Sequence, residues 1–132
     1  MSLFNKVITK VFGKKSDKDL KKIAPIISDI NVEFDKLKNL SDQEIKDKFN
    51  SIKLTLKNLT DQKNKDLNAS DLDSSEIEKK LIQLEKDYLN NHMVEVFAIV
   101  KDVSRRLEGT NFKVMETDMI WNMVHYDVQL IG

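Results

Sequence analysis

The side chains of this sequence that could act as acids, bases, nucleophiles or metal ligands form no recognisable catalytic or metal-binding group. His92 and His125 are the only two histidines, and neither has a second ligand at a spacing typical of metal sites. The sequence has no cysteine, no G-x-S-x-G nucleophile motif and no glycine-rich phosphate loop. We therefore expect no catalytic residue and no metal site in these 132 residues.

Residues 1–15 carry the pattern that most directly suggests a binding chemistry. Apolar residues recur every three or four positions with lysines between them, and no acidic residue occurs before Asp17. This spacing predicts a basic amphipathic helix, which can lie on an anionic membrane with its lysines at the headgroups. The alternative is that the apolar stripe packs against the rest of the protein. The residues concerned are Leu3, Phe4, Lys6, Val7, Ile8, Lys10, Val11, Phe12, Lys14 and Lys15.

Composition favours a mainly helical protein. Three glycines and one proline supply too few turns for a many-stranded sheet. The 22 basic and 22 acidic residues cancel, so we expect no nucleic acid partner. No apolar run approaches the ~20 residues that span a bilayer, and the N-terminus lacks the features of a signal peptide. The absence of cysteine agrees with a reducing cytoplasm.

Hydrophobic periodicity predicts the helical segments. Residues 16–59 are expected to form an antiparallel helix pair, and Ser41 with Glu44 forms a capping box at the start of its second helix. Residues 60–75 are rich in Asp, Asn, Lys and Ser, which predicts an exposed polar loop. Residues 76–107 return to the 3.6-residue period and predict a further helical segment.

Residues 108–132 have a different character. They are richer in β-branched and aromatic residues, and residues 110–116 predict a short strand or one arm of a hairpin. The sequence closes on the apolar stretch "HYDVQLIG", whereas a finished soluble domain usually closes on polar residues. We therefore expect this sequence to be the front part of a longer polypeptide.

Four stretches, in this order, resemble the N-terminal region of the SecA family, the ATP-driven motors of bacterial protein export. They are "VFGKKSDKDLKKI" at 11–23, "LSDQEIKDKFNSIK" at 40–53, "VFAIVKDVSRRL" at 96–107 and "MVHYDVQLIG" at 123–132. The last motif is the most specific of the four. The resemblance covers nearly the whole sequence.

This resemblance implies a helical N-terminal region that leads into a RecA-like α/β nucleotide-binding domain, which would begin within 108–132 and is cut before its phosphate loop. In the family, the glutamine of the last motif reads adenine, which implies nucleotide binding by Gln129 and contact of Tyr126 and Met123 with the base. A carboxamide offers one acceptor and one donor side by side, as adenine N6 and N7 require. The alternative is that Gln129 satisfies local backbone groups. Without a phosphate loop, we expect this segment alone to have no measurable ATPase activity and to bind nucleotide at best very weakly.

The resemblance also implies partners and a location. The full-length protein would use ATP with Mg²⁺ to push secretory preproteins through the SecY channel. A second copy of the same protein, in a homodimer, is a further candidate partner. The amphipathic first helix would contact acidic phospholipids and the channel, on a cytoplasmic protein that associates peripherally with the inner membrane. The other hypothesis is a stand-alone helical interaction module with a membrane-surface or partner-binding helix and no catalysis.

Overall fold

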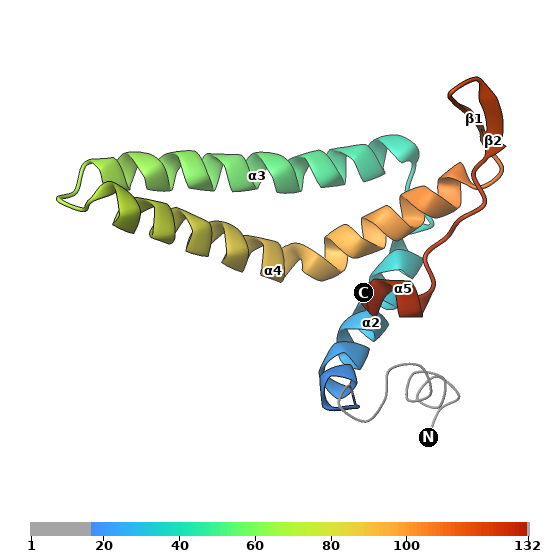
Figure 1. The fold of residues 1–132 in the computed structure, drawn as a ribbon, viewed down its shortest axis with the longest axis horizontal. Coiled ribbons are helices and arrows are strands. Elements are labelled where there is room, and N and C mark those ends of the chain that lie inside the picture. Colours follow the sequence, from blue (N-terminus) through green and yellow to red (C-terminus); the bar gives the residue numbers. More distant parts are fainter. Residues whose placement is uncertain (1–16, 132) are drawn as a thin grey trace. The chain divides into compact units, whose positions relative to one another are not determined.

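A computed structural model describes residues 17–131 of the chain. The described elements are α2 (Asp17–Leu37), α3 (Asp42–Asn68), α4 (Ser74–Leu107), β1 (Asn111–Val114), β2 (Thr117–Ile120) and α5 (Asp127–Ile131), as Figure 1 shows. The prediction of a mainly helical protein is confirmed. The predicted helix over 1–15, with all its membrane-contact residues, lies outside the described residues.

The chain divides into two compact units, and α4 runs through both. Unit 1 combines residues 1–39 with 97–132, and unit 2 comprises residues 40–96. Helices α2 and α3 therefore belong to different units, so the predicted antiparallel pairing within residues 16–59 stays a prediction. The helix predicted over 76–107 is confirmed as α4, which begins two residues earlier, at Ser74.

Unit 2 is a hairpin of two long helices, α3 and the part of α4 up to Val96 (Figure 1). The Tyr88 hydroxyl donates a hydrogen bond of 3.0 Å to the Ile52 carbonyl, and Lys48 forms an ion pair with Glu95. These contacts join the facing sides of α3 and α4. Side chains of opposite charge and of hydrogen-bonding type thus tie the hairpin together where few apolar residues are buried.

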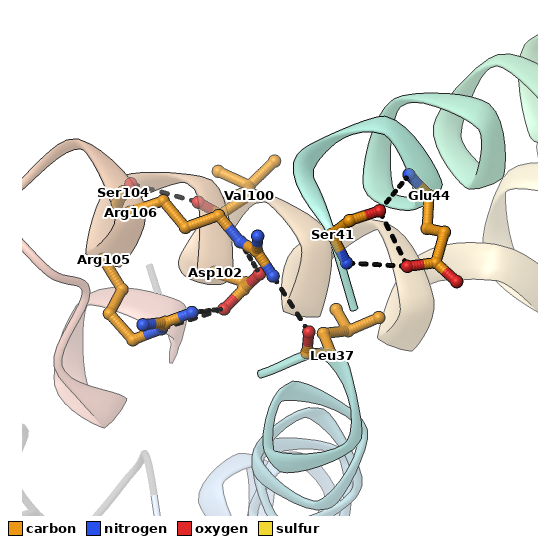
Figure 2. Close-up of polar contacts among 8 residues, drawn as sticks. All are labelled: Leu37, Ser41, Glu44, Val100, Asp102, Ser104, Arg105 and Arg106. Carbon is orange, nitrogen blue, oxygen red and sulfur yellow. Dashed lines mark hydrogen bonds and ion pairs between the residues drawn. The ribbon is translucent and has the colours of Figure 1, made fainter. Parts of the chain in front are cut away.

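The capping box predicted at the start of α3 is confirmed. The Glu44 amide donates to the Ser41 hydroxyl, while the Ser41 amide donates to the Glu44 carboxylate at 2.7 Å, as Figure 2 shows. This hydrogen bond from the Ser41 backbone, followed by that from the Ser41 hydroxyl, lowers the pKa of Glu44 from its ordinary value of 4.5. The charged form of Glu44 is therefore the one that caps the helix.

The prediction of an exposed loop over 60–75 is wrong, because most of this stretch is helical. Helix α3 continues to Asn68, and the connection to α4 comprises only residues 69–73. Polar side chains in this stretch pair along the helix: Gln62 donates to Asp66 at 2.9 Å, and Asn68 donates to the Asn64 carbonyl at 2.8 Å. Leu67 is buried and anchors this last turn. The polar composition reflects an exposed helix and not a loop.

Unit 1 has its core between α2 and the end of α4. Apolar residues that recur every three or four positions are buried along the second half of α2, and further buried apolar residues belong to α4. The Arg106 guanidinium donates to the Leu37 carbonyl at 3.0 Å, which joins the last residue of α2 to the last turn of α4. The buried apolar residues of this unit are Ile27, Ile30, Phe34, Leu37, Ala98 and Ile99.

A β-hairpin follows α4, as predicted for residues 110–116. Strands β1 and β2 pair antiparallel, with Phe112 opposite Met119 and Val114 opposite Thr117. The two turn residues, Met115 and Glu116, both have positive φ angles of 46° and 69°, which is the geometry of a tight primed turn. These two strands form the only sheet among residues 17–131. The start of a RecA-like domain within 108–132 therefore stays a prediction.

None of the helices between Asp17 and Ile131 combines the length and the apolar character that crossing a membrane would require.

Candidate functional site

The three residues predicted to contact nucleotide lie together around the start of α5. Tyr126 directly precedes this helix, and its carbonyl accepts hydrogen bonds from the amides of Gln129 and Leu130 at 2.9 and 3.2 Å. The side chain of Tyr126 is 75% exposed, and that of Met123 is 42% exposed. The Trp121 indole donates to the Met123 carbonyl at 2.8 Å and so fixes the backbone that leads to the helix. An aromatic ring, a thioether and a carboxamide are thus carried by residues within one short stretch of the chain, 123–129.

The carboxamide of Gln129 has a local role in the structure. Its Oε1 accepts a hydrogen bond of 2.8 Å from the amide of Tyr126, so Gln129 caps its own helix in the way that Glu44 caps α3. Its Nε2 has no hydrogen-bond partner among residues 17–131. The carbonyl oxygen of a carboxamide has two lone pairs, so Oε1 can accept a second hydrogen bond. The side chain is therefore held in one orientation and still presents a donor and an acceptor, and its contact with adenine stays a prediction.

A part-buried polar cluster connects α5 to the two helices of the core. Asn31 of α2 donates from Nδ2 to the Asp127 carboxylate at 2.9 Å and accepts at Oδ1 from the Lys101 ammonium of α4 at 2.6 Å. Lys101 Nζ also lies 3.6 Å from Asp127 Oδ1 and 5.0 Å from the centre of the Phe34 ring. We call Asn31, Lys101 and Asp127 the α5 clamp.

Asp102, the neighbour of Lys101, has no exposed surface and lies at the centre of a second cluster (Figure 2). Arg105 donates from Nε and Nη2 to Oδ1 at 2.9 and 2.8 Å, and Arg106 donates from Nε to Oδ2 at 2.6 Å. Arg106 also reaches the Leu37 carbonyl, one of the terminal carbonyls of α2 that no intrahelical amide can satisfy. Both carboxylate oxygens are occupied, which suits a structural anchor and leaves no free base.

Both histidines have local contacts in the structure. His125 Nδ1 lies 3.4 Å from the Ser104 hydroxyl, which itself donates to the Val100 carbonyl. His92 stacks on Tyr88, and its Nδ1 lies 2.9 Å from the Tyr88 carbonyl. In the described part of the chain, no group of three His, Cys, Asp or Glu side chains could hold a metal ion.

Adenine binding by the residues around the start of α5 stays a prediction, which concerns one end of an adenine nucleotide. Gln129, Tyr126 and Met123 offer what a purine base requires, namely a donor, an acceptor and apolar surface. The phosphate end requires a backbone cradle, a lysine and a magnesium ligand in a glycine-rich loop, and this sequence holds no such loop.

Sequence reasoning did not identify Asn31, Lys101, Asp102 or Asp127 as site residues. The pairs between Asp102 and the two arginines have helical spacings of three and four residues, a signal that could have indicated them. Asn31 and Asp127 are 96 positions apart, and their contact has no signature in a single sequence.

Comparison with known proteins gives a consistent result. The family model of the SecA DEAD-like domain matches residues 8–132. The chain is 40% identical over 144 aligned residues to the protein translocase subunit SecA of Chlorobium phaeobacteroides (strain BS1), and 39% identical to that of Chloroherpeton thalassium. Each alignment covers 96% of this chain and 14% of the relative, so the chain spans about one seventh of the length of these curated relatives. No solved structure matches the chain.

The Asp102 cluster predicts a large effect for a small substitution. Asp102→Asn should lower the free energy of unfolding of unit 1 by about 3 kcal/mol, because two guanidinium groups lose their carboxylate and only part of that loss is compensated by water. Urea unfolding followed by the fluorescence of Trp121, the only tryptophan, measures it. Asp61→Asn on the exposed face of α3 is the matched control. A change below about 0.5 kcal/mol for Asp102→Asn would contradict the central role of this carboxylate.

Proposed function

This chain belongs to the SecA family, and we propose that it is the N-terminal part of an ATP-driven preprotein translocase motor that pushes secretory proteins through the SecY channel. The observation that carries the proposal is the match of residues 8–132 to the SecA DEAD-like domain, together with about 40% identity over 96% of the chain to proteins named protein translocase subunit SecA. The alternative, a stand-alone helical interaction module, has no support beyond the helical content.

In this proposal the start of α5 reads the adenine of ATP. Gln129 would donate from Nε2 and accept at Oε1, with Tyr126 and Met123 lying against the base. Three features support this role: the exposure of Tyr126 and Met123, the Nε2 that has no partner in residues 17–131, and the hydrogen bond that fixes the carboxamide. ATP, with Mg²⁺ in the full-length protein, would supply the free energy for translocation. The residues of this chain bind and orient the base, and phosphoryl transfer needs a loop that they do not include.

We further propose that residues 1–15 contact the surface of the inner membrane and the SecY channel, as a peripheral attachment of a cytoplasmic protein. The apolar positions from Leu3 to Phe12 would insert between acidic phospholipids, and the four lysines from Lys6 to Lys15 would meet their headgroups. The support is the alternation of apolar and basic residues in this stretch. Secretory preproteins and a second copy of the full-length protein are further partners in this proposal, and nucleic acid is not among them.

Titration with adenosine tests the adenine site without any contribution from phosphate groups. Gln129→Glu keeps the oxygen that accepts from the Tyr126 amide but replaces the Nε2 donor, so it should weaken adenosine binding about fivefold or more while α5 stays capped. The measurement is the dissociation constant from NMR shift changes, with Gln62→Glu on α3 as the matched control. Equal affinity for adenosine and guanosine, or no effect of Gln129→Glu, would contradict the proposed base contact.

Hydrolysis of ATP by the purified chain would contradict the expectation that this segment alone is inactive.

Vesicle flotation tests the proposed membrane contact. The chain should bind vesicles that contain phosphatidylglycerol more strongly than vesicles of phosphatidylcholine alone, because lysines near an anionic surface each contribute about 1 kcal/mol. The double substitution Lys10→Glu with Lys14→Glu should abolish this preference. The same charge change at Lys63 and Lys65, on the exposed end of α3, should not. Equal binding to both kinds of vesicle would contradict the electrostatic part, and no binding to either would contradict the membrane contact itself.

A further inference from the structure

One residue of the α5 clamp, Asn31, is far from the proposed adenine site in the sequence. We infer that Asn31 is a positioning residue for adenine binding: together with Lys101 it holds Asp127, and thereby the helix start that carries Tyr126 and Gln129. This inference rests on the proposed function, because it concerns the same site. The hydrogen bonds of Asn31 go to Asp127 and Lys101, so its effect on Tyr126 and Gln129 passes through Asp127.

The chemistry at position 31 suits an asparagine in particular. Its Nδ2 donates to a carboxylate while its Oδ1 accepts from an ammonium group. An uncharged carboxamide can do both at once, whereas a carboxylate can only accept and an ammonium can only donate. Lys101 is buried, so its charge requires the oxygen of Asn31 at 2.6 Å as well as the carboxylate of Asp127 at 3.6 Å. Each of the three side chains is therefore a hydrogen-bond or ion-pair partner of the other two.

The helix that the clamp holds is too short to keep its place unaided. Helix α5 comprises five residues, Asp127–Ile131, and isolated helices of this length are not stable in water. Its position must therefore come from tertiary contacts. Asp127 is its first residue, next to Tyr126 and two positions before Gln129, so the clamp acts directly at the hydrogen bonds that define the site. Loss of the clamp should therefore increase the motion of both the Tyr126 carbonyl and the Gln129 carboxamide.

A charge swap tests this inference. Asn31→Asp places two carboxylates opposite each other, and it should speed the hydrogen exchange of the Gln129 and Leu130 amides and weaken adenosine binding about fivefold or more. The double substitution Asn31→Asp with Asp127→Asn reverses the direction of the hydrogen bond and keeps a carboxylate beside Lys101. It should restore both slow exchange and affinity, which a chain that fails to fold would not do. Asn58→Asp, on the exposed face of α3, is the matched control and should change neither quantity.

The two readouts separate the possible failures. Unchanged exchange at Gln129 and Leu130 in Asn31→Asp would overturn the inference, since the clamp would then not hold α5. Faster exchange with unchanged adenosine affinity would also overturn it, since the position of α5 would then not govern binding. If the unaltered chain binds no adenosine although exchange responds to the swap, the proposed adenine contact is overturned, and with it the nucleotide part of the inference.

Discussion

The carboxylate of Asp102, which has no exposed surface, is the group on which unit 1 depends. A buried charge without partners would cost several kcal/mol, and Asp102 avoids that cost because Arg105 and Arg106 occupy both of its oxygens from the next turn of the same helix. Arg106 then has a second nitrogen directed at the carbonyl of Leu37. A single turn of α4 thus satisfies its own buried acid and also caps the C-terminus of α2. The apolar residues of α2 and α4 can then be buried between two helix segments whose polar groups are already paired.

One turn of the same helix also serves the proposed site. Lys101 and Asp102 are consecutive, and both are buried, but they face different partners: Asp102 binds the arginines, and Lys101 binds Asn31 and Asp127. The first set holds α2 against α4, and the second holds the start of α5 against both. Gln129 therefore lies in a helix of five residues that has no stability of its own, and the exposed residues Tyr126 and Met123 lie in the segment that leads to this helix. Gln129 caps α5 through its carboxamide oxygen, and in our proposal the same carboxamide reads adenine.

The sequence could predict features that depend on local patterns. The apolar stripe of α2, the capping box of Ser41 and Glu44 and the strand near residues 110–116 each follow from spacing or residue type, and the structure contains them. The polar stretch from 60 to 68 was not predictable in the same way, because composition alone does not distinguish a solvated loop from an exposed helix held by pairs such as Gln62 with Asp66. The contact between Asn31 and Asp127 was beyond any local pattern, since only the packing of α5 against α2 brings these positions, 96 residues apart, together. The residues proposed for adenine were identified through a family resemblance, whereas the side chains that hold them in place became visible only in three dimensions.

The most direct test of adenine recognition at the start of α5 is an NMR measurement on the chain with labelled methionine methyl groups, in the presence of adenosine. The account predicts intermolecular NOEs between the adenine protons and the methyl group of Met123. It predicts none to Met115, which is 95% exposed at the tip of the hairpin and serves as an internal control. Contacts to Met115 of similar strength, or bound adenosine with no contact to Met123, would contradict the account.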